Sequence, residues 1–107
     1  MEPIAPPVNR KLLEAELSDS TFLRNTNNGH KKIYVFTAQE APNLMTEVGR
    51  LREITFRDAG GGTGKSLDID EFDTMEVPFQ QLIVWDPMEN EIVGGYRFIH
   101  GRDLACE

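Results

Sequence analysis

The distribution of apolar and polar positions along the first half of the chain predicts two helices and a strand. Residues 10–17 are expected to form a short helix, because leucines recur at helical spacing and Asn9 precedes them as a suitable N-cap. The β-branched and aromatic run at residues 32–37 predicts a strand. Residues 43–57 carry the clearest helical pattern, and the three glycines at 60–62 are expected to end that helix.

The second half of the chain predicts a β-hairpin. Residues 81–85 form a nearly continuous apolar run, which is typical of a central strand, and residues 86–90 predict a turn into a partner strand at 91–99. Gly94 and Gly95 in that strand predict a bulge or a close approach of another backbone. The order of elements predicts an α/β (α+β) fold class, with helices packed on a small, largely antiparallel sheet.

The long helix is expected to present one apolar face and one charged face. Its apolar face is predicted to consist of Leu44, Val48, Leu51, Ile54 or Thr55, and Phe56. Glu47 and Arg50, and likewise Glu53 and Arg57, have the spacing of ion pairs on the helix surface. An acidic segment at residues 68–73 follows the glycines and is expected to form an irregular turn or one helical turn.

Composition is that of an ordinary soluble globular domain, or of a piece of a larger one. Hydrophobic residues make up 39% of the chain and charged residues 27%. Cys106 has no second cysteine to pair with, which fits a reducing compartment. The first residues lack the features of a signal peptide, and no apolar run has the length of a membrane span. We therefore expect a cytoplasmic protein, with peripheral contact to the inner membrane as a further possibility.

The net charge of −7 argues against nucleic acid as the main partner. The chain has 18 acidic and 11 basic residues, and the basic ones are scattered. Binding to phosphates requires a basic face, so this class of function is excluded as the main one. The acidity could attract a cationic ligand such as an amine, or it could simply serve solubility.

Residues 59–66 resemble a phosphate-binding loop, but both flanking segments are wrong for that function. Such a loop follows a buried strand and opens a helix, whereas here a predicted amphipathic helix precedes it and the acidic residues 68–73 follow it. The acidic residues also fail as a calcium loop, because Phe72 and Asp73 occupy positions that require a ligand and a glycine. His30, His100 and Cys106 lie in unrelated settings and form no cluster of ligands, so no metal site is predicted.

Three short motifs remain as candidates for chemistry. They are Arg52-x-x-x-Phe56 on the long helix, Asp68-x-Asp70-x-x-Asp73 in the acidic segment, and Gly94-Gly95-Tyr96-Arg97 on the last strand. Their order and spacing resemble the N-terminal half of the acyl-homoserine-lactone synthases. They are more similar still to the acyltransferases that attach a fatty acyl chain to ornithine or glycine for aminolipid synthesis, a group often labelled hemolysins.

This resemblance covers residues 32–100 and implies the N-terminal half of an acyl-CoA N-acyltransferase fold, the GNAT-like fold. It implies one partial domain over residues 1–107, in which 1–31 is an N-terminal extension with a short helix and 32–107 is the first half of the acyltransferase domain. It also implies a donor thioester, carried by acyl carrier protein or coenzyme A, and a small amino acid as the amine acceptor. The resemblance implies that most of the part of this fold that holds the donor lies beyond Glu107, so the chain alone is expected to be inactive and to bind no cofactor.

The expected site residues follow from the resemblance and from elementary chemistry. Asp68, Asp70, Asp73 and Arg97 are the expected catalytic residues, and Arg52, Phe56, Gly94 and Gly95 are the expected substrate-binding residues. Acyl transfer requires a neutral amine, so a carboxylate that binds the ammonium group and accepts its proton is suitable, and Asp68 is the candidate for that role. Clustered carboxylates repel one another unless cations intervene, so Asp70 and Asp73 are expected to pair with Arg52 and Arg97.

Two alternatives stay open from the sequence. One is an acidic binding module for a cationic ligand, and the other is a nucleotide-binding protein that uses residues 59–66. The glycine-rich stretch at 60–66 replaces an aromatic stretch of the autoinducer synthases, so their acceptor specificity is not carried over. The oligomeric state is not predicted.

Overall fold

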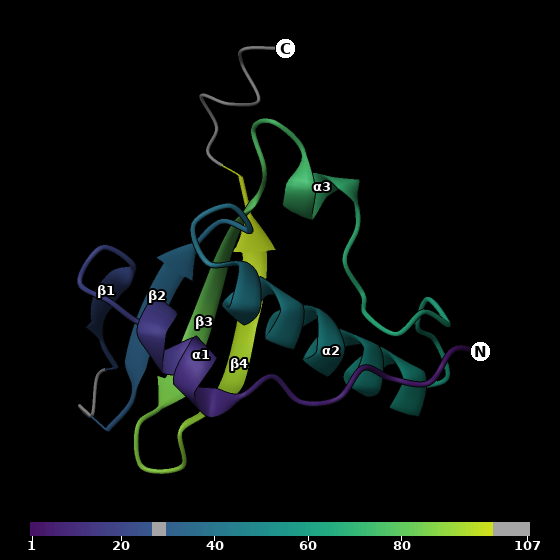
Figure 1. The fold of residues 1–107 in the computed structure, drawn as a ribbon, viewed down its shortest axis with the longest axis horizontal. Helices are drawn as coiled ribbons and strands as arrows, with labels where there is room; N and C mark the ends of the chain where they lie inside the picture. The colour runs from purple at the N-terminus through teal and green to yellow at the C-terminus, as the bar shows by residue number, and fades with distance from the viewer. Residues whose placement is uncertain (27–29, 100–107) are drawn as a thin grey trace.

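The computed structural model describes residues 1–26 and 30–99, which form seven helices and strands (Figure 1). In chain order these are α1 (Arg10–Glu16), β1 (Phe22–Asn25), β2 (Lys32–Phe36), α2 (Pro42–Asp58), α3 (Glu71–Thr74), β3 (Gln80–Asp86) and β4 (Glu91–Phe98). Every predicted helix and strand is present, with ends within one residue of the predicted ones. The acidic segment forms one helical turn, α3.

The four strands form one antiparallel sheet in the order β1-β2-β3-β4. The predicted central position of residues 81–85 is confirmed, because β3 pairs with both β2 and β4. Strand β1 was not predicted from the sequence. It has only four residues, its pairing with β2 is irregular between Phe22 and Arg24, and none of its residues is buried, so it lacks a pattern that sequence reasoning could detect.

Helices α1 and α2 cover one face of the sheet and form the hydrophobic core with it (Figure 1). Alternate residues of the two inner strands point toward the helices, and the core consists of Leu13, Tyr34, Phe36, Ala41, Leu44, Met45, Ile83 and Trp85. Figure 1 also shows that α2 crosses the strands and that its C-terminal half continues past β4. This overhang leaves part of the predicted apolar face of α2 without a covering strand.

The predicted apolar face of α2 is therefore divided into two parts. Leu44 is fully buried and Val48 packs against the core, whereas Phe56 near the other end is 50% exposed. The prediction that Glu47 and Glu53 form ion pairs on the helix surface was correct for the pairs and wrong for their environment. Both carboxylates are buried. The main-chain N of Val8, in the segment before α1, donates to Glu47, and the main-chain N of Thr63, in the loop after α2, donates to Glu53.

The start of α2 is capped by a side chain from another helix. Pro42 suits the first turn, but Ala41 at the N-cap position has no side-chain acceptor. The carboxylate of Glu16, at the end of α1, accepts hydrogen bonds from the main-chain N of Asn43 (3.1 Å) and of Leu44 (2.7 Å). It thereby satisfies two of the amide groups that a helix leaves unpaired at its N-terminus.

The glycine pair of β4 shows both features that the sequence predicted. Val84 pairs with Gly94 and Trp85 with Ile92, so Val93 is an extra residue that forms a bulge next to the glycines. A Cβ atom at Gly95 would lie 2.5 Å from the carbonyl oxygen of Leu82, which means that the backbones approach closely. A Cβ atom at Gly94 would meet nothing within 4 Å.

Within residues 1–26 and 30–99, none of the helices combines the length and the apolar character that crossing a bilayer requires. His100, Cys106 and part of the predicted segment 32–100 lie outside the described residues.

Candidate functional site

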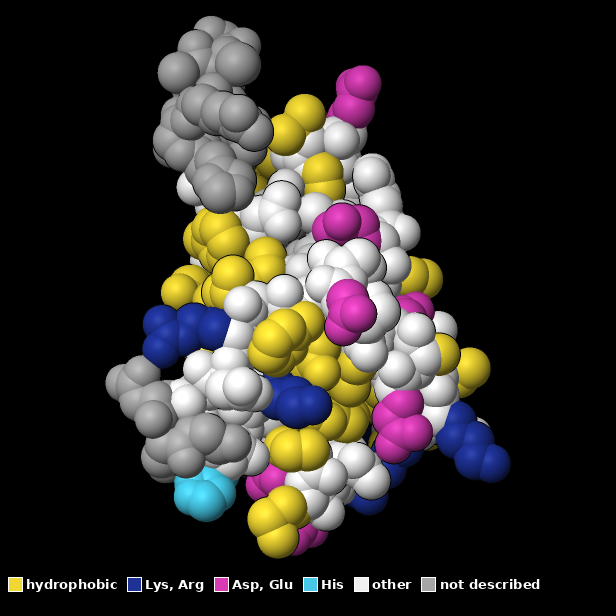
Figure 2. Space-filling view, turned by 90° about the vertical axis from the view of Figure 1, so that its left-hand side faces the viewer, with side chains coloured by type: hydrophobic (Ala, Val, Ile, Leu, Met, Phe, Trp, Pro, Cys, Tyr) yellow, Lys and Arg dark blue, Asp and Glu magenta, His cyan; other side chains and the backbone are white. Residues whose placement is uncertain are grey.

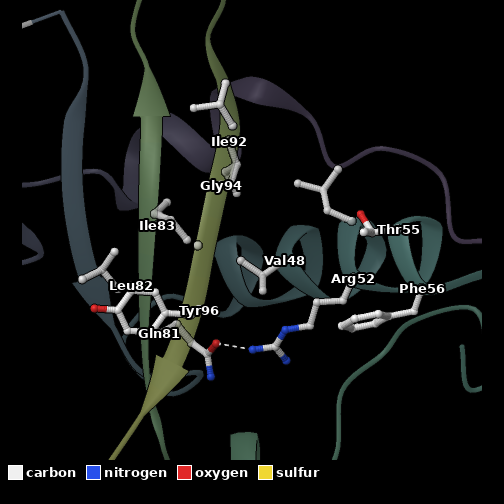
Figure 3. A pocket seen from close by; sticks show the side chains of 13 residues that line it. Val48, Arg52, Thr55, Phe56, Gln81, Leu82, Ile83, Ile92, Gly94 and Tyr96 are labelled. Carbon is white, nitrogen blue, oxygen red and sulfur yellow. Dashed lines mark hydrogen bonds between the residues drawn. The ribbon is translucent and has the colours of Figure 1, made fainter. Parts of the chain in front are cut away.

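A pocket of about 370 Å³ lies between the C-terminal half of α2 and strand β4 (Figure 3). It lies where α2 leaves the sheet, beside the edge strand β4. Most of its wall is apolar, and the guanidinium of Arg52 and the amide of Gln81 supply polar groups. The lining residues are Val48, Leu51, Arg52, Thr55, Phe56, Gln81, Leu82, Ile83, Ile92, Val93, Gly94, Gly95 and Tyr96. All four residues that the sequence predicted for substrate binding line this pocket.

A charged network beside the pocket is centred on the carboxylate of Asp73. This side chain is 0% exposed and accepts hydrogen bonds from Arg52 Nη1 (3.0 Å), Gln81 Nε2 (2.8 Å) and the main-chain N of Asp70 (3.1 Å). Arg97 Nη1 lies 3.4 Å from it. A buried carboxylate needs such compensation, and here two guanidinium groups and an amide provide it.

The local sequence explains why the acidic segment folds as it does. The Asp70 side chain accepts a hydrogen bond from the main-chain N of Phe72 (3.0 Å), and the Asp73 side chain accepts one from the main-chain N of Asp70. Together they form a capping box that starts α3. The spacing Asp-x-x-Asp thus builds the helical turn that presents Asp73 to the cations on α2 and β4.

Arg97 joins α3 to the last strand. Its Nη1 atom is 2.7 Å from Asp70 Oδ1, and its guanidinium carbon lies over the rings of Phe72 (5.7 Å to the centroid) and Phe79 (5.3 Å). The hydrogen bond from Arg97 lowers the pKa of Asp70 below its usual value. The Asp70 side chain is 44% exposed, so it presents a stable negative charge to solvent.

The structure places Asp68 differently from the other predicted acidic residues. Its main-chain N donates to the carbonyl of Gly49, and its own carbonyl oxygen accepts a weak hydrogen bond from Arg52 (3.4 Å). Its carboxylate has no hydrogen bond or ion pair with the residues that the structure describes. Arg52, Asp70, Asp73 and Arg97 therefore form one network, and Asp68 joins it through its backbone.

Sequence reasoning missed Gln81, which contacts both Arg52 and Asp73. It also missed Phe72 and Phe79 as the aromatic neighbours of Arg97. A signal for Gln81 was present, because it shares an inward-facing side of β3 with Ile83 and Trp85. A polar residue at such a position must find hydrogen-bond partners when the strand is buried.

The glycine-rich loop at residues 59–66 is folded around an internal carboxylate. Glu53 accepts hydrogen bonds from the main-chain N of Thr63 (3.0 Å) and of Gly64 (3.1 Å), and from Arg57 Nε (2.9 Å). The bond from the Thr63 amide is the main reason that the pKa of Glu53 falls from 4.5 to about 2. Two amides that a phosphate-binding loop would offer to a nucleotide are thus engaged with a carboxylate of the protein, and helix α2 precedes the loop, as predicted.

On the β1 side of the molecule, the basic side chains of the described residues stand apart from one another and form no broad basic area. Figure 2 shows hydrophobic side chains there among separated Lys, Arg, Asp and Glu side chains. Among the described residues, no three His, Cys, Asp or Glu side chains are grouped as ligands of a metal ion.

Comparison with known proteins identifies the class to which this fold and site belong. The model of the acetyltransferase (GNAT) domain family matches residues 51–107, which is more than half of the chain. The chain therefore belongs to the GNAT acetyltransferase domain family, and both the predicted fold class and the predicted relationship to GNAT-like acyltransferases are confirmed.

Two curated relatives match the whole chain. The glycine N(alpha)-acyltransferase of Bacteroides thetaiotaomicron is 59% identical over 107 residues, and the protein of the same name from Phocaeicola vulgatus is 56% identical over the same length. The matches cover 32% and 33% of these relatives, so the chain spans about a third of their length. No solved structure matches the chain.

Proposed function

We propose that this chain is part of an N-acyltransferase that moves a fatty acyl group from a thioester to the α-amine of glycine or a similarly small amino acid. The donor in this proposal is acyl carrier protein or coenzyme A, and the product is an N-acyl amino acid, which is a simple aminolipid. The observation that carries the proposal is the identity of 59% and 56% across the whole chain with two glycine N(alpha)-acyltransferases.

The geometry of the site supports this function. An acyl chain needs an apolar surface, and the pocket between α2 and β4 has one. An amino acid acceptor carries a positive and a negative group, and the pocket adjoins a network with both signs of charge. The pocket thus combines an apolar wall for the donor with polar groups for the acceptor.

The proposed reaction needs no covalent intermediate on the protein. The neutral amine nitrogen attacks the carbonyl carbon of the thioester, so that a C–N bond forms and the C–S bond breaks. The nitrogen loses one proton and the departing sulfur gains one, which gives the amide and the free thiol. Asp68, whose carboxylate has no partner among the described residues, remains the candidate for the group that accepts the proton.

Asp70 suits a different role in this reaction. Because Arg97 lowers its pKa, Asp70 is a poor proton acceptor at neutral pH but a persistent negative charge. In the proposal it attracts the ammonium form of the acceptor and keeps Arg97 in place.

The test is an assay of the full-length native protein with glycine and a long-chain acyl thioester of either carrier. N-acylglycine, measured by mass spectrometry together with the released thiol, is the expected product. The Asp70→Asn variant lacks the negative charge and is expected to lower kcat/KM by about tenfold or more. A tenfold drop in kcat/KM reflects a modest loss of transition-state stabilisation. Asp58→Asn, at the exposed end of α2, is the matched control and should retain activity.

Two results would contradict the proposal at different levels. If neither thioester yields an acylated amine, the proposed activity is wrong, and amine binding without turnover would then favour the acidic binding module. If transfer occurs and Asp70→Asn is as active as Asp58→Asn, the activity stands and the assigned role of Asp70 is wrong.

A further inference from the structure

Gln81 has an unusual environment for a neutral polar side chain. It is 1% exposed, it lines the pocket, and both ends of its amide are hydrogen-bonded to charged groups. Its Oε1 atom accepts from Arg52 Nη2, and its Nε2 atom donates to Asp73 Oδ1 at 2.8 Å. A primary amide is suited to this bridge, because it offers an acceptor to the cation and a donor to the anion without adding charge.

The contacts of Gln81 close a ring of three side chains. Arg52 donates to Asp73, Gln81 donates to Asp73, and Arg52 donates to Gln81. The ring joins Arg52 on α2 to residues of α3 and β3 that follow it by more than 20 positions in the sequence. Figure 3 shows the bond between Gln81 and Arg52 at the pocket. Arg52 is thus restrained from two sides, whereas a long arginine side chain on an exposed helix surface would sample many rotamers.

This arrangement leaves part of the Arg52 guanidinium available. Its Nη1 group donates to Asp73 and to the carbonyl of Asp68, and its Nη2 group donates to Gln81. The N–H group on Nε and one N–H group on Nη2 have no partner among the residues that the structure describes. A guanidinium with two such groups can bind a carboxylate through two parallel hydrogen bonds.

We propose that Gln81 is a positioning residue, which holds Arg52 so that its remaining N–H groups bind the carboxylate of the acceptor amino acid in the pocket. This inference rests on the proposed function and adds to it the recognition of the acceptor. A substrate with an α-carboxylate is then favoured over an amine that lacks one. The apolar remainder of the pocket stays available to the acyl chain.

The experiment compares two acceptors, glycine and glycinamide, in the full-length native protein. They differ in the carboxylate that Arg52 is proposed to bind. The wild-type protein is expected to favour glycine, measured as the ratio of the two kcat/KM values. In Gln81→Met, which removes both hydrogen bonds at similar side-chain length, this ratio is expected to fall about tenfold, as for the loss of a charge-assisted hydrogen bond. The loss is expected in KM for glycine, and KM for the acyl thioester should stay unchanged.

The chain offers a matched control in the preceding residue. Gln80 lies on the opposite side of β3, where it pairs with Phe98, and it does not line the pocket. Gln80→Met is expected to keep the wild-type preference. Gln81→Asn keeps the amide but is one methylene shorter, and it is expected to lose part of the preference. It serves as the second variant if Gln81→Met does not fold.

Each outcome decides the inference. A selective loss for glycine in Gln81→Met, absent in Gln80→Met, supports it. Equal losses for both acceptors would show that Gln81 only supports the fold, and a wild-type protein that does not prefer glycine would also overturn the inference. In both of these cases the protein still acylates amines, so the proposed function survives. If no amine is acylated, the proposed function fails and the inference fails with it.

Discussion

Replacing Gly95 by alanine would press a methyl group against the backbone of the neighbouring strand. The added Cβ atom would lie 2.5 Å from the carbonyl oxygen of Leu82 and 3.3 Å from the Cα atom of Ile83. Carbon and oxygen atoms in adjacent strands normally stay about 3.3 Å or more apart, so β3 and β4 would have to separate by roughly 0.8 Å at this point. Both nearest atoms belong to the backbone, which cannot rotate away as a side chain would.

The expected effect on stability is a difference of two terms. Overpacking of this kind costs about 1–3 kcal/mol. Alanine also restricts the unfolded chain, which returns about 0.4–1 kcal/mol. Gly95→Ala is therefore expected to lower the free energy of unfolding by roughly 1.3 kcal/mol at the middle of these ranges, and by at most about 2.6 kcal/mol.

Gly94 provides the control, because a Cβ atom there would meet nothing within 4 Å. Gly94→Ala keeps the favourable term without the clash, so its stability is expected to equal or exceed that of the wild type by up to about 1 kcal/mol. The assay is urea unfolding of the full-length native protein and both variants, compared at unchanged m-values. The reasoning is refuted if Gly95→Ala unfolds at the same urea concentration as Gly94→Ala.

Two further predictions concern buried contacts of α2. Glu16→Ala removes the cap of this helix and is expected to destabilise the protein by about 1–2 kcal/mol. The control Glu14→Ala, on the exposed side of α1, should change the stability by less than about 0.5 kcal/mol. Equal unfolding midpoints of the two variants would contradict the capping role. Glu53 has its pKa lowered from 4.5 to about 2, so the stability that its charge contributes is fully present above pH 4.5 and is lost as the pH falls toward 2. The measurement is denaturation of the wild type and of Glu53→Gln across this pH range. The difference between their free energies of unfolding should be largest near neutrality and shrink below pH 4.5. A difference that stays constant would show that the charge of Glu53 does not stabilise the fold.

Part of the candidate site could be predicted before the fold was known. The motifs that carry Arg52, Asp70, Asp73 and Arg97 indicated both the family and the pairing of these charges, and the structure brings the four together. Opposite charges at these positions must compensate one another once they are buried, which sequence reasoning can anticipate. It could have marked Gln81 as an inward-facing polar residue of β3, but not its partners, because a glutamine has no preferred charge partner and becomes a bridge only when α2 and α3 approach β3.

Local sequence by itself determined the helices, the two central strands and the turns between them. The period of α2, the capping box of Asp70 and Asp73, and the hairpin after Asp86 depend on residues close in the chain, so their signals are readable without tertiary information. The continuous apolar run of β3 likewise indicated its central place in the sheet.

Only the tertiary structure decided which polar groups became buried and what they bind. Glu53 is spaced for a surface ion pair, yet the amides of Thr63 and Gly64 enclose it. Phe56 belongs to an apolar face, yet it stays half exposed because α2 continues past the edge of β4. Burial of a residue depends on which distant segments of the chain pack against it. Those contacts exist only in the folded protein, so a local sequence pattern cannot predict them.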